Sequence, residues 1–117
     1  LDFHSMAPQW PGRPEMTAPD ICLGDAHGTS CSAALRDKVR DAFCQLGYGV
    51  ELNRPFPGGY ITRHYGRPAS GRESLQIEIS KALYLDAKGE KSPNYSAFKR
   101  DVTQVLRGLA TALNPAL

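Results

Sequence analysis

Hydrophobic and polar residues alternate in one short stretch of the chain, SLQIEIS, at positions 74–80. The apolar positions are Leu75, Ile77 and Ile79, and the polar positions between them are Gln76 and Glu78. A period of two is typical of a β-strand with one face in a core. This strand therefore carries a carboxylate at its centre. The alternation leaves two interpretations of Glu78: a residue on a solvated face, or a general base aimed into a cleft.

Apolar residues at helical spacing predict two helices. The first is expected over residues 32–46, with Ser30 or Ser32 as its N-cap and Gly47 just past its end. Its predicted buried face consists of Leu35, Val39, Phe43 and Leu46. The second is expected to begin near Pro93, capped by Ser92, and to end at Pro115. Its predicted apolar face consists of Phe98, Val102, Val105, Leu106, Leu109 and Leu113.

Further strands are expected on both sides of the first helix. The predicted extended segments are residues 1–4, 20–25, 48–53, 60–65 and a continuation of the 74–80 strand through 81–86. Residues 5–20 contain four prolines and a glycine, which predicts an irregular loop. Because strands alternate with helices, the pattern favours an α/β fold in a single domain spanning residues 1–117.

Composition excludes several classes of protein. The net charge of +2 arises from 14 basic and 12 acidic residues that are scattered along the chain, so no nucleic-acid partner is expected. No apolar run reaches the roughly 18 residues of a membrane span, and no signal peptide is recognisable. The three cysteines form no C-x-x-C motif and are expected to be reduced thiols in a cytoplasmic protein. The chain opens in an apolar run without methionine, which predicts that it starts inside a strand.

His4 and Glu78 are candidates for catalysis by position and chemistry. His4 follows a predicted strand, where catalytic residues of open α/β sheets often lie, and neutral imidazole is a common metal ligand. Its alternative role is a hydrogen bond to a loop carbonyl. A partly buried Glu78 would have a raised pKa and would take a proton from water near neutral pH.

The segment GGYITRHYGRP, at 58–68, concentrates side chains that suit an anionic ligand. Arg63 and Arg67 supply guanidinium groups that match a carboxylate in a bidentate manner, and His64 lies between them. The paired glycines permit close approach of a ligand to the backbone. The competing interpretation is a hairpin whose charged residues face water.

The segment GDAHGTSC, at 24–31, supports two further hypotheses. Asp25 and His27 are candidate metal ligands, although their spacing matches no standard motif. Cys31, placed before a helix, is a candidate nucleophile with His27 as its base. The plainer interpretation is a helix-entry turn whose small residues serve capping.

Four stretches together resemble one known family. LDFHSM, DICLGDAHGTSC, NRPFPGGYITRHYGRP and LQIEISKALYLD follow one another in an order and spacing similar to those of N-formylglutamate amidohydrolases. The resemblance covers nearly the whole chain, and GGYITRHYGRP followed by LQIEI is its most specific part. It implies a mixed, twisted sheet with flanking helices, partly similar to the zinc carboxypeptidases and aspartoacylases. It also implies zinc-dependent hydrolysis of N-formyl-L-glutamate to L-glutamate and formate, a step of histidine degradation.

The resemblance also implies roles for individual residues. His4 matches a zinc-binding histidine at a strand end, and Glu78 matches the glutamate expected to act as general base and acid. Arg63 and His64 lie where substrate-binding residues are expected, and Arg67 is a further candidate for a substrate carboxylate.

The sequence matches only the C-terminal portion of that family, whose remaining zinc ligands come from an N-terminal half without a counterpart here. One expectation is therefore a part of a longer enzyme. The alternative is a non-catalytic remnant that binds acidic amino acids or serves assembly, with an uncovered sheet that favours homo-oligomers.

Overall fold

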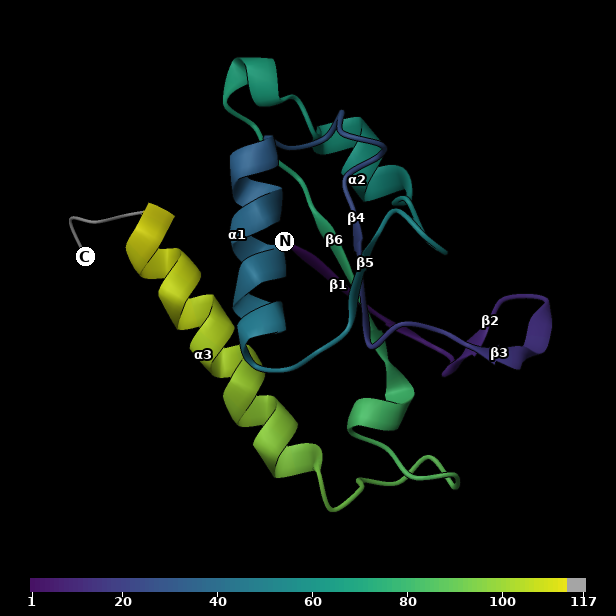
Figure 1. Cartoon of the computed structure of the whole chain (residues 1–117). Helices are drawn as coiled ribbons and strands as arrows, with labels where there is room; N and C mark the ends of the chain where they lie inside the picture. Colours follow the sequence, from purple (N-terminus) through teal and green to yellow (C-terminus); the bar gives the residue numbers. More distant parts are fainter. Residues whose placement is uncertain (114–117) are drawn as a thin grey trace.

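The computed structural model describes residues 1–113 and is organised around a four-stranded mixed sheet (Figure 1). The strands, in spatial order, are β1 (Asp2–Met6), β6 (Gln76–Ser80), β4 (Ile21–Gly24) and β5 (Val50–Leu52). β1 pairs in parallel with β6, β6 pairs antiparallel with β4, and β4 pairs in parallel with β5. The expected α/β fold with a mixed sheet and flanking helices is thereby confirmed.

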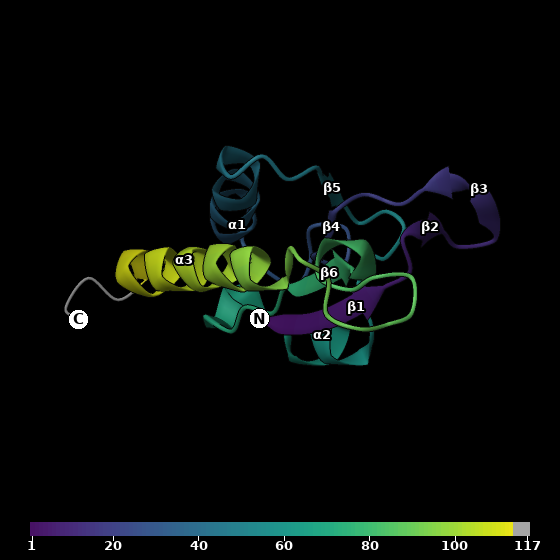
Figure 2. The ribbon, with the colours of Figure 1, turned by 90° about the horizontal axis from the view of Figure 1, so that it is seen from below.

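Two helices form the layer on one side of this sheet. They are α1 (Ala33–Gln45) and α3 (Tyr95–Leu113), and α2 (Tyr60–Tyr65) lies on the opposite side (Figures 1 and 2). The capping prediction for α1 is confirmed: the Ser32 hydroxyl accepts a hydrogen bond from the Leu35 amide at 3.1 Å. Gly47 follows the helix with a φ of +93°, a conformation that costs glycine little.

The alternation along the strands separates a core face from a polar face. On the core face, Ile21 and Leu23 of β4 lie beside Ile77 and Ile79 of β6. The helix residues packed into the same cluster are Leu35, Val39 and Phe43 of α1 and Phe98, Val105 and Leu109 of α3. The opposite face of the same strands carries Gln76, Glu78 and Cys22, all buried but only one of them apolar.

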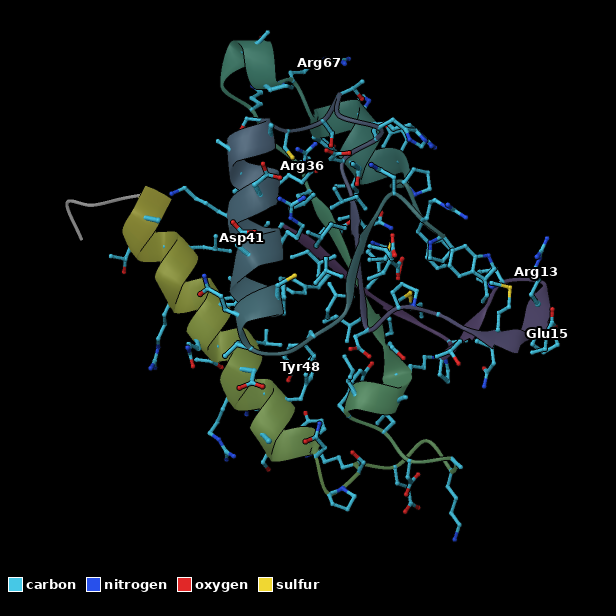
Figure 3. The ribbon with its side chains drawn as sticks, viewed as in Figure 1. Arg13, Glu15, Arg36, Asp41, Tyr48 and Arg67 are labelled. Carbon is cyan, nitrogen blue, oxygen red and sulfur yellow. The ribbon has the colours of Figure 1, made fainter. Side chains whose placement is uncertain are left out.

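Tyr48 joins α1, β5 and α3 at one end of the core (Figure 3). Its hydroxyl donates a hydrogen bond to Asp101 Oδ2 at 2.5 Å. Its ring makes edge-to-face contacts with Phe43 and Phe98, with centroid separations of 6.1 Å and 5.6 Å. The long helix α3 is therefore tied to the sheet by both apolar packing and a polar contact.

Three sequence predictions are wrong in their secondary structure. Residues 60–65, expected to be extended, form the helix α2, and the predicted strand continuation after residue 80 is a 3-10 turn, η2 (Lys81–Leu83), capped by Ser80. Residues 5–20, expected to be an irregular loop, contain a hairpin of β2 (Gln9–Trp10) and β3 (Arg13–Thr17) that projects from the body (Figure 1). A further 3-10 turn, η1 (Pro68–Ser70), follows α2.

The predicted limits of the last helix are partly tested. The helix begins at Tyr95 rather than at Pro93, and the Ser92 hydroxyl accepts a hydrogen bond from the Asn94 amide at 3.3 Å. Pro115 and the side chain of Leu113 lie outside the described residues.

No helix within the described part of the chain is long and apolar enough to cross a membrane. Cys22, Cys31 and Cys44 are unpaired thiols.

Candidate active site

Glu78 lies at the centre of the polar face, between one residue from each neighbouring strand. It is in register with His4 on β1 and with Cys22 on β4. The Glu78 side chain is buried, with 6% of its surface exposed, so it does not sit on a solvated face. The sheet pairing therefore brings together the two residues, His4 and Glu78, that the sequence singled out for chemistry.

The surroundings of Glu78 favour proton transfer. Burial raises the pKa of this carboxyl, and the negative charge of Asp2 acts in the same direction. His4 and a hydrogen bond donated by Gln76 Nε2 at 3.0 Å oppose the shift without cancelling it. A carboxylate with a raised pKa is a better base near neutral pH than an exposed one.

His4 presents one ring nitrogen to its own strand and leaves the other available. Its Nε2 lies 2.8 Å from Asp2 Oδ2, and Nδ1 makes no hydrogen bond within residues 1–113. A carboxylate on one imidazole nitrogen orients the ring for binding through the other. His4 thus suits a metal as a single ligand. Residues 1–113 contain no group of three or more His, Cys, Asp or Glu side chains that could hold an ion by themselves.

A glycine lets a second segment descend onto the polar face. Gly24 of β4 is in register with Gln76, and a Cβ at Gly24 would lie 2.7 Å from the carbonyl carbon of Pro57. The backbone at 57–59 therefore packs directly on the sheet. There the Gly59 amide donates to Gln76 Oε1 at 2.9 Å, which sets the start of α2 over the strand that carries Glu78.

The arginines of the GGYITRHYGRP segment line a cavity of about 350 Å³. Its lining residues include Arg63, Arg67, His27 and Gly58. Arg63 Nη1 also donates to the Gly58 carbonyl at 3.1 Å, which fixes the guanidinium at the rim. The guanidinium groups of Arg63 and Arg67 give this cavity the positive charge that an anionic ligand requires. Larger grooves run along α3, on the core side of the sheet.

His64, also predicted to bind substrate, does not line this cavity. Its ring stacks on Tyr60 at a centroid separation of 4.8 Å and meets the edge of Tyr65 at 4.7 Å. All three side chains lie on the exposed surface of α2.

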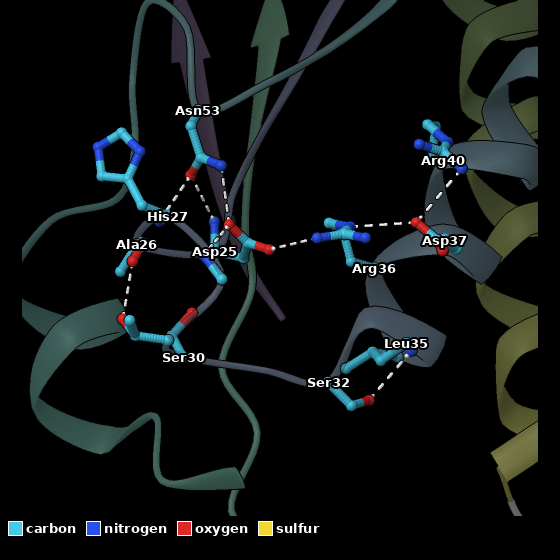
Figure 4. Close-up of polar contacts among 12 residues, drawn as sticks. Asp25, Ala26, His27, Ser30, Ser32, Leu35, Arg36, Asp37, Arg40 and Asn53 are labelled. Carbon is cyan, nitrogen blue, oxygen red and sulfur yellow. Dashed lines mark hydrogen bonds and ion pairs between the residues drawn. The ribbon is translucent and has the colours of Figure 1, made fainter.

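Asp25 holds the loop that forms the other wall of the cavity (Figure 4). Its carboxylate, 1% exposed, accepts hydrogen bonds from the Gly28 amide at 2.8 Å, Asn53 Nδ2 at 2.8 Å and Arg36 Nη1 at 3.3 Å. These three donors tie the buried carboxylate to its own loop, to Asn53 and to α1. The role of Asp25 as a metal ligand stays a prediction.

Asn53 completes this loop and was not singled out from the sequence. Its Oδ1 accepts hydrogen bonds from the amides of Asp25 and His27, at 3.1 Å and 3.2 Å. Asn53, Ala26 and His27 all have positive φ values, of 63°, 51° and 57°. Asparagine is among the residues that tolerate this region, which is the signal that position 53 offered. The clamp fixes the His27 backbone and leaves its ring on the cavity wall. His27 is therefore a residue of the cavity wall, and its pairing with Asp25 in a metal site stays a prediction.

The cysteine-nucleophile hypothesis is not supported by the environment of Cys31. The thiol is buried, and burial raises its pKa to about 11, with the carboxylates of Asp25 and Glu73 acting in the same direction. His27 and Cys31 share no hydrogen bond in the described chain. A thiol held protonated and out of solvent lacks the thiolate character that nucleophilic cysteines need.

Comparison with known proteins places most of this chain among relatives of one kind. The family model of N-formylglutamate amidohydrolase matches residues 1–85. N-formylglutamate deformylases of Pseudomonas aeruginosa and Pseudomonas putida are 34% and 33% identical to this chain over 99% and 96% of its length. The crystal structure of N-formylglutamate amidohydrolase from Ralstonia eutropha JMP134 superposes with a TM-score of 0.90 at 32% identity over 98% of the chain. The chain spans 42% of each Pseudomonas protein and 43% of the Ralstonia chain.

Proposed function

The chain belongs to the N-formylglutamate amidohydrolase family, and from this premise we propose that it is part of an enzyme that hydrolyses N-formyl-L-glutamate to L-glutamate and formate. The observation that carries the proposal is the buried carboxylate of Glu78, in register with His4 on a polar sheet face, and the chain adds a separate cavity lined by Arg63 and Arg67. We further propose that the reaction depends on zinc and serves histidine degradation in the cytoplasm.

In the proposed mechanism, His4 would be one of the zinc ligands, through the imidazole nitrogen that Asp2 does not engage. The remaining ligands would come from outside the described residues, because these hold no complete ligand set. When bound, zinc supplies a Lewis acid that lowers the pKa of a coordinated water and polarises a carbonyl oxygen.

Glu78 performs both proton transfers. It accepts a proton from the water that attacks the formyl carbon, and it returns that proton to the amide nitrogen as the carbon–nitrogen bond breaks. The products are formate and the free amino group of glutamate. Burial raises the pKa of Glu78, which makes this carboxylate a stronger base than an exposed one.

Arg63 and Arg67 bind the carboxylates of the substrate in this proposal. Both line the same cavity, and a guanidinium group pairs with a carboxylate through two parallel hydrogen bonds. His64 would contribute only at the outer edge, since it is stacked between two exposed tyrosines. Recognition would then depend on the glutamate moiety more than on the small formyl group.

The test is hydrolysis of N-formyl-L-glutamate by the whole polypeptide that carries this chain, with and without a zinc chelator. Glu78→Gln is expected to lower turnover by roughly 100- to 10,000-fold, the usual contribution of a general base, while calorimetry still detects substrate binding. Full turnover by this variant would rule out the proposed role of Glu78. Elemental analysis of the 117-residue chain alone should find far less than one zinc per chain.

A second candidate function is a binding and assembly module. Its support is that the arginine-lined cavity is built from residues of this chain, and that Leu1, next to the edge strand β1, and Phe3, within it, are 51% and 41% exposed. This module would bind glutamate or N-formylglutamate without metal and self-associate through β1. Calorimetry without heat, together with a monomer in sedimentation, would dismiss it.

A further inference from the structure

Gln76 contacts two parts of the polar face that have different roles in the proposed reaction. One is the proposed base, Glu78, and the other is the segment that starts α2. Its side chain is 5% exposed and lies on the same strand and face as Glu78. Gln76 Nε2 donates to Glu78 Oε2 at 3.0 Å, and Gln76 Oε1 accepts from the Gly59 amide at 2.9 Å. One buried amide therefore contacts both the proposed base and the segment that starts α2.

The chemistry of the two partners fixes the orientation of this amide. The Gly59 amide is only a donor, so the atom that faces it must be the oxygen of Gln76. The ionised carboxylate of Glu78 is only an acceptor, so it requires the NH₂ group. A glutamate at position 76 keeps the first contact and loses the second, and a methionine loses both.

The neighbours of Gln76 leave room for this bridge. Its register partner on β4 is Gly24, which carries no side chain and lets residues 57–59 descend. The Thr62 hydroxyl lies 3.5 Å from Gln76 Oε1, so the first turn of α2 is anchored at two points. Arg63, the next residue, lines the cationic cavity. The start of α2 and the arginine beside it are thus placed relative to Glu78 through Gln76.

We propose that Gln76 is a positioning residue for the reaction, holding the Glu78 carboxylate in its working orientation and fixing α2, with Arg63, above it. This inference rests on the proposed function, since it assigns Gln76 a role in the same site.

The first measurement uses the 117-residue chain and does not depend on activity. Hydrogen exchange of the Gly59 amide is followed by NMR in the wild type, Gln76→Glu and Gln76→Met. Gln76→Met is expected to speed exchange at Gly59 about five- to tenfold, the equivalent of one lost hydrogen bond. Gln76→Glu is expected to leave it unchanged. The amides of Ile77 and Ile79 report whether the strand remains folded. Unchanged exchange in Gln76→Met would overturn the anchoring half of the proposal.

The second measurement is steady-state hydrolysis of N-formyl-L-glutamate by the whole polypeptide. Gln76→Glu is expected to lower kcat roughly 10- to 100-fold with little change in KM, because Glu78 loses its orienting donor and faces a second carboxylate instead. Gln76→Met is expected to lower kcat similarly and also to raise KM, because α2 is released. Gln104→Glu, the same change on the exposed surface of α3, serves as the matched control with wild-type kinetics.

The outcomes separate this inference from the proposed function. A wild-type polypeptide that does not hydrolyse N-formyl-L-glutamate would refute the function, and the positioning role with it. An active wild type with full kcat in Gln76→Glu would leave the function standing and overturn the positioning role alone.

Discussion

The two faces of the central sheet use the same strands for opposite purposes. On one face, Ile77 and Ile79 pack against Phe43 and Val39 in a core that excludes water. On the other, Gln76 and Glu78 are as well buried but are held by hydrogen bonds to their neighbours. Apolar burial stabilises the fold directly, whereas polar burial costs free energy that hydrogen bonds only partly recover. Along β6, Ile77 and Ile79 therefore stabilise the fold by apolar burial, whereas Gln76 and Glu78 are buried at a cost in stability.

The largest expected effect comes from the core face. Ile77→Ala removes buried methyl groups from a fully buried side chain and should reduce the free energy of unfolding by about 2–5 kcal/mol. Urea unfolding of the 117-residue chain measures it. Gln104→Ala, on the exposed side of α3, is the control and should lie within about 0.5 kcal/mol of wild type. A loss below that margin for Ile77→Ala would show that the two faces do not differ as described.

A smaller loss is expected at Asp25, a polar group on the helix side of the sheet. Asp25→Asn keeps the shape of the side chain but replaces one acceptor oxygen by a donor, which in either amide orientation faces a donor: Arg36 Nη1, or the Gly28 amide with Asn53 Nδ2. A buried group left without its partner costs about 1–3 kcal/mol. Urea unfolding compares it with Asp41→Asn, at an exposed position on α1. Equal stabilities for the two variants would mean that the Asp25 clamp is not required for folding.

Tyr48→Phe isolates one hydrogen bond while leaving the aromatic packing in place. The ring keeps its contacts with Phe43 and Phe98, and only the bond to Asp101 is lost. The expected loss in unfolding free energy is about 0.5–1.5 kcal/mol. Thermal unfolding of the single variants and of Tyr48→Phe/Asp101→Asn provides a double-mutant cycle. Fully additive losses would show that the two side chains do not interact.

The smallest effect, and the one of opposite sign, is expected at Glu78. Because burial raises its pKa, the folded chain binds this proton more tightly than the unfolded chain does. The stability contribution of Glu78 therefore falls as the pH rises from the ordinary carboxyl pKa through the raised value, and the loss is complete above it. Glu78→Gln should abolish this dependence and be more stable than wild type above that window. Urea unfolding across the acidic and neutral range tests it, and a wild type that gains stability over that window relative to the variant would contradict it.

The sequence predicted the parts of this molecule in which local pattern and tertiary environment agree. The alternation at residues 75–79 identified β6, and Ser32 with Leu35 marked the start of α1 correctly. It also selected His4 and Glu78, although only the parallel pairing of β1 with β6 places them side by side. That pairing joins strands more than 70 residues apart, which no local pattern encodes.

The failures occur where distant contacts override local preference. YITRHY has the aromatic and β-branched residues of a strand, yet it forms α2 because Gly59 is held by Gln76 and a Cβ at Gly66 would meet Ser30. The prolines of residues 5–20 indicated a loop, whereas an exposed two-stranded ribbon accommodates Pro14. The part played by Gln76 was not foreseen, since a polar residue beside Glu78 suits a solvated face equally well.

The strict alternation of β6 has a last consequence for folding fidelity. A slip of one residue in its pairing would turn every side chain to the opposite face of the sheet. Glu78 and Gln76 would then be driven among Phe43 and Val39, and Ile77 and Ile79 would line the polar face. The misaligned chain would bury a carboxylate in an apolar layer and forfeit its best packing at once. The polar residues that give this strand its chemistry therefore also disfavour pairing in a shifted register.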